Sequence, residues 1–318
     1  MCLDSHSSSG GTPSIDLVIA LYNEQESLAG FHKLLEETVL SGGYTRRYIY
    51  VDDGSTDETP ALLNRLASTD SRIKVIHLSR NFGHQAALSA GLDAATADIV
   101  ISMDGDGQHP PSLIQEMLRL HAAGYDVVQA QRLDDLQSAS LFKRMTSALF
   151  YRLVSFVGEV NISPGTSDFR LLSRQALDAL KCLPEYHRFL RGMIVWIGFS
   201  NVMLPYKPGT RLGGKPKYSL KRMLVLAADG FFSFSLVPLW IGLLVGSAFI
   251  ALAALELAYM TYVWLGGHRD QLVPGWTSLV LILTVASAIN MILQGILGIY
   301  VGMIFKEVKR RPVYLVKK

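Results

Sequence analysis

The chain has 318 residues, 49% of them hydrophobic, which is enough for one large domain or two smaller ones. Its formal net charge of +3 is too small to indicate a nucleic-acid partner, and its two cysteines, Cys2 and Cys182, exclude a disulfide framework and a cysteine-based metal site. Residues 1–14 are rich in Ser and Gly and lack the apolar core of a secretory signal, so we expect a disordered tail that starts in the cytosol.

From residue 15 to residue 130, short apolar runs alternate with stretches of helical spacing. This alternation predicts an α/β fold with a mostly parallel sheet and right-handed crossovers. The predicted strands are 15–21, 47–51, 73–78, 99–103 and 125–130. The predicted helices are 27–40, 58–67, 85–95 and 112–122.

Polar residues follow several of these strands where the apolar runs stop. They are Tyr22-Asn23-Glu24, Asp52-Asp53, Asn81 and the pair Asp104 and Asp106. Ligands of parallel sheets bind at the carboxyl ends of the strands, so we expect the site at this edge. The first strand is not followed by G-x-G-x-x-G, and the chain has no G-x-x-x-x-G-K-[ST], which argues against a dinucleotide cradle and excludes a P-loop.

Three oxygen-bearing side chains, Asp104, Asp106 and Gln108, occupy alternate positions after the fourth strand. Such a set suits a hard divalent cation that shares its oxygen ligands with substrate phosphates. The alternative is a polar strand-to-helix loop in which an Asp serves as a helix cap. The acidic residues that converge at the neighbouring strand ends favour the metal site.

The pattern changes after residue 130. An apolar stripe with interspersed basic residues over 138–158 fits either a core helix or an interfacial amphipathic helix, and the membrane segments described below favour the second interpretation. The remaining elements of this part are a loop at 161–170, helices at 173–180 and 187–197, and a strand at 200–205.

A loop rich in Gly, Pro and cations follows at 206–218. It is either a solvated flexible linker or a lid whose Arg211 and Lys217 close on phosphates. Arg132, at the end of the fifth strand, is a third cation suited to phosphate.

Two long stretches near the C-terminus carry no charged side chain: 25 residues over 231–255 and 35 residues over 271–305. About 20 apolar residues span a bilayer, so we predict two transmembrane helices, near 231–263 and 277–304. The basic residues beyond the second stretch indicate that the C-terminus is on the cytoplasmic side of the cell's inner (plasma) membrane. Because two spans return the chain to the side from which it started, we expect the N-terminus and the catalytic domain on the cytoplasmic side as well.

The sequence therefore predicts five parts. They are a disordered tail (1–14), a cytosolic catalytic domain (15–217), a juxtamembrane amphipathic helix (218–229), a two-helix transmembrane domain (230–305) and a basic cytosolic tail (306–318). A cation at the Asp pair would bridge a diphosphate, and the membrane tether suggests that the other substrate is a lipid.

The ordered set of motifs resembles family 2 glycosyltransferases, and more narrowly the polyprenol-phosphate glycosyltransferases of the dolichol-phosphate mannose synthase and bactoprenol glucosyltransferase group. The motifs are Tyr22-Asn23-Glu24, Asp52-Asp53-Gly54-Ser55-Thr56-Asp57, Arg80-Asn81-Phe82-Gly83, Asp104-Gly105-Asp106-Gly107-Gln108-His109-Pro110, Ser167-Asp168-Phe169-Arg170, Phe189-Leu190-Arg191-Gly192 and Lys215-Pro216-Lys217-Tyr218. The resemblance covers nearly the whole chain.

This resemblance implies a GT-A fold, a nucleotide-sugar donor, a polyprenyl phosphate acceptor, and inverting transfer that depends on Mg²⁺ or Mn²⁺. It implies the following roles: Ala20, Tyr22 and Glu24 at base and ribose, Asp53 at the base, Asp104 at ribose and metal, Asp106 and Gln108 at the metal, and Arg132, Arg211 and Lys217 at donor or acceptor phosphate. Ala20-Leu21 replaces the family's usual Pro, and Gly105 and Gly107 replace bulkier residues.

Asp168 occupies the position where the subgroup has an acidic residue near the sugar. It is either a general base, a salt-bridge partner of Arg170 or Arg191, or a ligand of sugar hydroxyls. The acceptor phosphate is already anionic at neutral pH and needs little help from a base.

The donor favoured by the two-span organisation is UDP-glucose, with GDP-mannose or another UDP-sugar as alternatives. The branch also suggests a homotetramer. A processive polysaccharide synthase would need more spans and usually a Q-x-x-R-W motif, which the chain lacks. A membrane-tethered nucleotide-sugar sensor is the alternative without catalysis.

Overall fold

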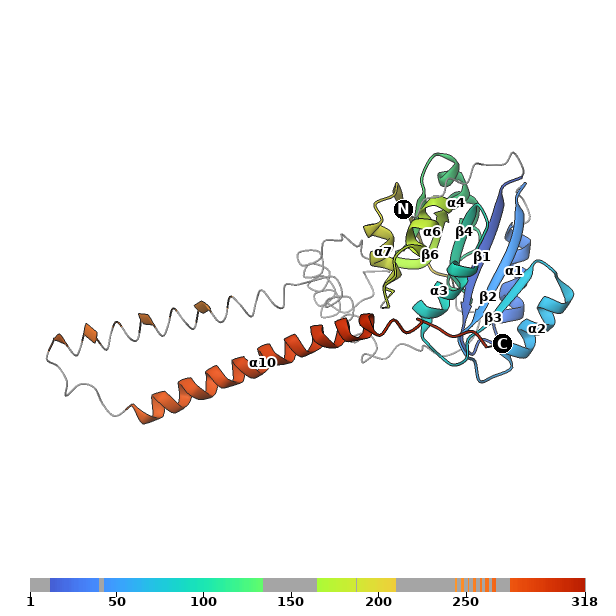
Figure 1. Cartoon of the computed structure of the whole chain (residues 1–318). Coiled ribbons are helices and arrows are strands. Elements are labelled where there is room, and N and C mark those ends of the chain that lie inside the picture. Colours follow the sequence, from blue (N-terminus) through green and yellow to red (C-terminus); the bar gives the residue numbers. More distant parts are fainter. Residues whose placement is uncertain are drawn as a thin grey trace. The chain divides into compact units, whose positions relative to one another are not determined.

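The described residues of the computed structural model are 12–39, 43–133, 165–186, 188–209 and 275–317, with isolated helical positions between 244 and 266. The chain forms two compact units. The first contains the α/β domain together with Arg311–Lys318 from the other end of the chain, and the second contains Leu224–Arg310 (Figure 1).

Seven strands of the described chain form one sheet in the order β3-β2-β1-β4-β6-β5-β7. They are β1 (Ser14–Leu21), β2 (Thr45–Asp52), β3 (Ile73–His77), β4 (Ile99–Asp104), β5 (Val127–Arg132), β6 (Thr166–Ser173) and β7 (Asn201–Tyr206). All neighbouring pairs are parallel except those of β6, which is antiparallel to β4 and β5. The mostly parallel sheet and its first five predicted strands are confirmed, with small shifts at the strand ends.

The helices of the described chain are α1 (Leu28–Val39), α2 (Thr59–Thr69), α3 (His84–Ala94), α4 (Leu113–Ala122), α6 (Arg174–Lys181), α7 (Leu190–Trp196) and α10 (Trp276–Val308). Helices α1 to α4 confirm the four predicted in the first part of the chain. The central strands β1 and β2 are buried on both faces, as expected of parallel strands covered by helices, and side chains such as Leu17 and Tyr50 are fully enclosed.

Helix α3 packs closely against the sheet at Gly91, which has no side chain. A Cβ atom built on Gly91 would meet Val18 Cγ1 at 2.3 Å and Val51 Cγ2 at 3.1 Å. A larger residue would push the helix off β1 and β2. The close packing fixes the first residue of α3, His84, beside the carboxyl ends of the strands.

The loop predicted at 161–170 is wrong over its second half, because Thr166–Ser173 forms β6. All eight of its residues are buried between β4 and β5. The polar residues Asp168 and Arg170 gave the segment a loop-like composition, yet they form an ion pair with each other inside the sheet. Burial of charged groups is tolerated when they are paired in this way.

The later elements of the domain agree with the sequence. The helices predicted at 173–180 and 187–197 form α6 and α7, and the strand predicted at 200–205 forms β7. Ser173 caps α6: its hydroxyl accepts a hydrogen bond from the backbone N–H of Ala176 at 3.2 Å.

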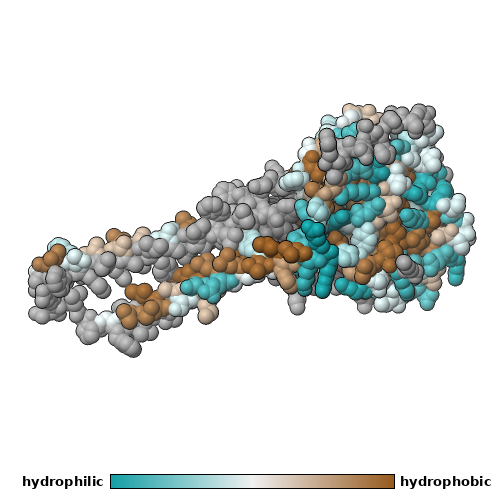
Figure 2. Space-filling model, viewed as in Figure 1, coloured by the Kyte–Doolittle hydropathy of each residue, from teal (hydrophilic) through white to brown (hydrophobic). Residues whose placement is uncertain are grey.

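Helix α10 coincides with the second predicted transmembrane segment. Within it, Val285–Val308 is long and apolar enough to cross a bilayer, and it is the one such helix among the described residues. Hydrophobic side chains gather along it (Figure 2), and several of them, such as Leu283 and Val301, are exposed. The first predicted span, the helix at 138–158 and the segment at 218–229 lie outside the described residues, apart from the isolated helical positions.

The C-terminal residues, predicted as a basic tail, include a segment that pairs with the edge of the sheet. Val316 forms an antiparallel bridge with Leu78, directly after β3. The chain end, dark red in Figure 1, reaches β3 in this way. A pairing between residues so distant in sequence has no local signal.

Candidate active site

The loops after β1 and β2 interlock at the carboxyl edge of the sheet. The backbone N–H of Asn23 donates to Ser55 Oγ at 2.9 Å, and Asn23 Oδ1 accepts from the N–H of Thr56 at 2.8 Å. Asn23 has a φ of 52°, in the left-handed region that Asn tolerates better than most residues. These contacts hold Tyr22 and Glu24, both predicted nucleotide ligands, in a defined loop.

Asp53 connects the loop after β2 to the loop before α3. Its two carboxylate oxygens accept hydrogen bonds from the backbone N–H groups of Phe82 at 2.7 Å and Gly83 at 3.0 Å. Burial raises the pKa of Asp53, and these two hydrogen bonds oppose that shift. Asp53 is thus an anchor for the segment that leads to His84, and its predicted contact with the nucleotide base stays a prediction.

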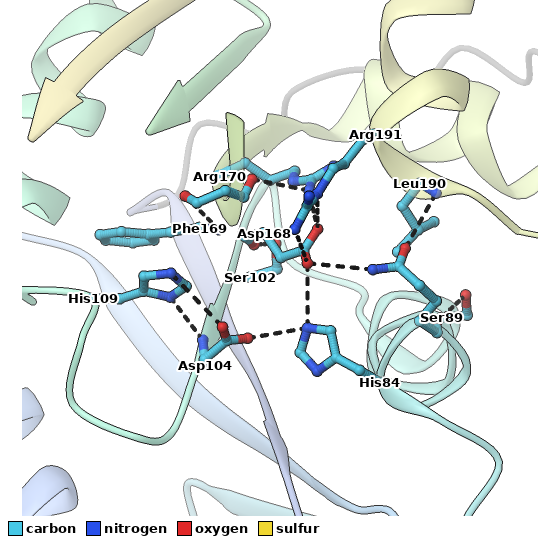
Figure 3. Close-up of polar contacts among 12 residues, drawn as sticks. His84, Ser89, Ser102, Asp104, His109, Asp168, Phe169, Arg170, Leu190 and Arg191 are labelled. Atoms are coloured by element: carbon cyan, nitrogen blue, oxygen red, sulfur yellow. Dashed lines mark hydrogen bonds and ion pairs between the residues drawn. The ribbon is translucent and has the colours of Figure 1, made fainter. Parts of the chain in front are cut away.

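His84 lies between two carboxylates that come from neighbouring strands (Figure 3). Its Nε2 is 3.1 Å from Asp104 Oδ1 and 3.3 Å from Asp168 Oδ2. Burial alone would lower the pKa of His84, but Asp104 and Asp168 together raise it well above the usual value. His84 was not predicted as a site residue from the sequence.

Asp168 is the most heavily bonded side chain of the site (Figure 3). Its buried carboxylate is paired with the guanidinium groups of Arg170 and Arg191, and Gln85 Nε2 donates to it at 3.3 Å. Burial would raise the pKa of Asp168, but Arg191, His84 and Arg170 hold it well below the usual range. Both salt bridges that the sequence left as alternatives are therefore present.

Asp104 ends β4 and is held between two imidazoles. Its backbone N–H donates to His109 Nδ1 at 3.0 Å, so the proton of a neutral His109 lies on Nε2, which is 3.7 Å from Asp104 Oδ2. Burial raises the pKa of Asp104, but His84 and His109 lower it below the usual value overall. The ring of His109 stacks on Phe169 with centroids 5.2 Å apart, which fixes its orientation.

The segment after Asp104 contacts the last residue of β5. The N–H of Gln108 donates to Asp106 Oδ1 at 3.0 Å, and Arg132 Nη1 donates to Gln108 Oε1 at 3.3 Å. The φ of 80° at Gly107 allows this tight turn, which a side chain would strain. A predicted phosphate ligand, Arg132, therefore lies beside a predicted metal ligand.

The residues present suit a divalent cation by their chemistry. Asp104, Asp106 and Gln108 offer only oxygen donors, as Mg²⁺ and Mn²⁺ prefer. Asp104 Oδ1 is buried and accepts no hydrogen bond of good geometry within the described part of the chain, although His84 forms an ion pair with it. No group of three or more His, Cys, Asp or Glu residues that could hold a metal ion occurs among the described residues.

The remaining predicted residues divide into two groups. Ala20 is buried in β1, in register with Asp104 of β4, at the edge where the site lies. Arg211 and Lys217 lie outside the described residues. Gln85 and His109 were not predicted as site residues from the sequence, and Arg170 and Arg191 were predicted only as possible partners of Asp168.

Comparison with known proteins gives a consistent family. The glycosyl transferase family 2 model matches residues 16–181. The relative "Uncharacterized glycosyltransferase YkcC" from Bacillus subtilis (strain 168) is 37% identical over 303 residues, which are 95% of this chain and 93% of that protein. "Bactoprenol glucosyl transferase" from Shigella phage SfII is 34% identical over 304 residues, 96% of this chain and 97% of that protein.

A weaker likeness extends to a solved structure. Glucosyl-3-phosphoglycerate synthase from Mycobacterium tuberculosis, in complex with Mn²⁺, UDP-glucose and phosphoglyceric acid, has a TM-score of 0.49 to this chain at 18% identity, and the match covers 69% of this chain and 78% of that one.

Proposed function

This chain belongs to glycosyltransferase family 2, and on that premise we propose that it moves a sugar from a nucleotide-sugar donor to polyprenyl phosphate at a membrane. The observation that carries the proposal is the group of Asp104, Asp106, Gln108 and Arg132 at the carboxyl ends of β4 and β5. Support for the lipid acceptor comes from the relative named bactoprenol glucosyl transferase and from the apolar helix α10.

The donor would bind with its diphosphate over Asp104, Asp106 and Gln108. A bound Mg²⁺ or Mn²⁺ would supply neutralisation of the negative charge on the departing nucleoside diphosphate. Arg132 would hold a phosphate oxygen with its guanidinium, which already points to Gln108 Oε1. Arg211 and Lys217 keep their predicted phosphate roles, and Tyr22, Glu24 and Asp53 keep theirs at the nucleoside.

The reaction would be a single displacement at the anomeric carbon. An oxygen of the lipid phosphate forms a bond to this carbon while the bond from the same carbon to the diphosphate oxygen breaks, and the configuration inverts. The attacking oxygen is anionic at neutral pH, so no proton has to be removed. The protein contributes chiefly by positioning both phosphates and by electrostatic stabilisation of the leaving group.

Asp168 would act in this scheme as a buried anion that organises its neighbours. Its contacts with Arg170, Arg191 and His84 occupy both carboxylate oxygens and hold its pKa far below neutrality, which leaves it a weak base. Its contribution would be to fix Arg191 and His84 around the sugar. The general-base role, predicted as one of three alternatives, is tested below by the activity and melting temperature of Asp168→Asn.

We propose UDP-glucose as the donor, with GDP-mannose or another UDP-sugar as alternatives. The relative named as a glucosyl transferase supports glucose. We also propose a multi-pass membrane anchor with a cytoplasmic catalytic domain. Because two spans enclose little volume by themselves, we further propose a homo-oligomer such as a tetramer.

A donor screen tests this proposal. The purified full chain is incubated in lipid nanodiscs with undecaprenyl phosphate, Mg²⁺ or Mn²⁺, and one radiolabelled UDP- or GDP-sugar at a time. We expect one donor, UDP-glucose, to give label that is extracted into organic solvent with the lipid. Binding of a donor without labelled lipid would instead support the sensor alternative. Product from GDP-mannose alone would show that the donor is GDP-mannose and would leave the proposed reaction unchanged.

A further inference from the structure

The C-terminal residues touch the α/β domain at two places that bracket one segment. The carbonyl of Leu315 accepts a hydrogen bond from the N–H of Ser79 at 2.8 Å, and the N–H of Lys317 donates to the carbonyl of His77 at 2.7 Å. The hydroxyl of Tyr314 donates to Asp93 Oδ2 at 3.0 Å. Ser79 precedes α3, and Asp93 lies in its last turn, so both ends of the segment 79–93 are held.

This segment carries two residues of the candidate site at its middle. His84 and Gln85 form the first turn of α3, and both contact Asp168. From Asp93 to His84 the helix spans roughly 14 Å as one rigid element. A displacement at Asp93 would therefore be carried to His84 and Gln85.

A second connection runs from the same contact to the other side of Asp168. Asp93 also accepts hydrogen bonds from Arg188 Nη1, at 3.0 Å to each carboxylate oxygen. Arg188 lies shortly before Arg191, which pairs with Asp168, and the N–H of Leu190 donates to Gln85 Oε1 at 3.3 Å. The Tyr314 hydroxyl thus adds a donor to the carboxylate that links α3 to the start of α7.

The chemistry of Tyr314 suits a permanent contact. Burial and the neighbouring Asp93 raise the pKa of Tyr314 to about 12, so the hydroxyl keeps its proton and donates at any physiological pH. The backbone pairing at Leu315 and Lys317 also covers part of the exposed edge of β3, which is the outermost strand on this side of the sheet.

We propose that residues 314–317 act as an intramolecular strap that holds α3 and the segment before it, through contacts at Ser79 and Asp93. Tyr314 is then a positioning residue for the contact of His84 and Gln85 with Asp168. The strap follows α10 in the chain after a short connection, and its contacts with the segment 79–93 are hydrogen bonds. The strap is a contact of the chain with itself and does not depend on the identity of the sugar.

Three variants of the full chain test the strap. Tyr314→Phe removes only the hydroxyl that reaches Asp93. Lys317→Pro removes the N–H that donates to His77, and Lys317→Ala is its matched control because it keeps this N–H and loses the same side chain. Hydrogen exchange followed by mass spectrometry reports the backbone amides of residues 79–94 and of Leu190, and the transfer assay reports kcat and the donor KM; this kinetic arm rests on the proposed function.

We expect Tyr314→Phe and Lys317→Pro to speed exchange at residues 79–94 and at Leu190 by roughly three- to tenfold, the usual effect of losing one hydrogen bond. We expect kcat to fall by a similar factor while the donor KM changes by less than about twofold, because Asp53 still holds the loop before α3. Lys317→Ala should behave as the parent chain.

Unchanged exchange at these amides, or faster exchange with unchanged kcat, would overturn the positioning role. A lower melting temperature with neither local change would mean that the tail only covers the sheet edge. If the parent chain transfers no sugar from any donor, the proposed function fails, whereas the exchange at Leu190 still decides whether the strap positions Gln85.

Discussion

Arg191 donates two hydrogen bonds to Asp168, from Nη2 to Oδ2 at 2.9 Å and from Nε to Oδ1 at 3.2 Å. This two-point contact joins the first turn of α7 to a strand buried in the middle of the sheet. Arg170 pairs with the same carboxylate, and its own side chain is almost fully buried. Asp168 is therefore the shared counter-ion of two guanidinium groups, one of which is almost fully buried.

Asp168→Asn should destabilise the protein as well as inactivate it. The substitution leaves the buried Arg170 without its counter-charge, and breaking a buried pair in this way costs about 3–5 kcal/mol. For a domain of this size we expect the melting temperature of the purified chain to fall by at least about 6 °C. If Asp168 were instead an ordinary general base, the same variant would lose activity at an unchanged melting temperature.

Asp106→Asn should have the opposite profile. Asp106 accepts a hydrogen bond from the N–H of Gln108, and the amide oxygen of Asn can accept the same bond. The melting temperature should therefore stay within about 1 °C of the parent. Loss of a metal-binding carboxylate should weaken Mn²⁺ binding at least about tenfold and abolish transfer. Electron paramagnetic resonance of free Mn²⁺ during a titration measures the binding.

The control for this variant is Asp178→Asn, which removes a surface carboxylate that pairs with Arg174 on α6. It should bind Mn²⁺ and transfer sugar as the parent does. Metal-dependent turnover retained by Asp106→Asn would refute the assignment of Asp106 to the metal.

His84→Ala should lower kcat, because Asp104 and Asp168 then face each other without the imidazole that now pairs with both. We expect a loss of roughly tenfold, typical of removing one polar contact with a charged group. His84→Gln places an N–H near the position of Nε2 and should recover most of the activity. Equal losses in both variants would show that the shared N–H donor is not what matters at this position.

Gly54→Ala should disturb the loop that carries Asp53. Gly54 has a φ of 65°, and a Cβ there would meet the carbonyl carbon of Arg80 at 2.4 Å. We expect a loss of about 2 kcal/mol in the free energy of unfolding and a higher donor KM. Gly30→Ala, with no atom within 4 Å of the new Cβ in α1, is the matched control and should stabilise by up to about 1 kcal/mol. Denaturant unfolding compares the two variants, and equal stability of both would contradict the close backbone contact.

The sequence was most informative where an apolar run ended in charge. The strands before Tyr22, Asp53 and Asp104 were predictable because an α/β alternation places their carboxyl ends on one edge. Strand β6 was not, because the period of its buried residues is hidden by Asp168 and Arg170, whose mutual neutralisation is visible only in three dimensions.

The same reason explains the site residues that were missed. A single His at a helix start gives no sign that two carboxylates from β4 and β6 will meet it, since the register of Ser102 with Arg170 sets their approach. The pairing of Val316 with Leu78 depends on a contact across most of the chain, and no local pattern encodes it.

We propose that glycosyl transfer to a polyprenyl phosphate takes place at the site of Asp104 and Asp106. The most direct measurement incubates the purified full chain with UDP-[¹⁴C]glucose, undecaprenyl phosphate and Mn²⁺, and determines the anomeric configuration of any labelled lipid. We predict a labelled undecaprenyl phosphate-sugar with the configuration opposite to that of the donor, formed by the parent chain and not by Asp106→Asn. Donor that binds but yields no labelled lipid, with any UDP- or GDP-sugar, would contradict the claim.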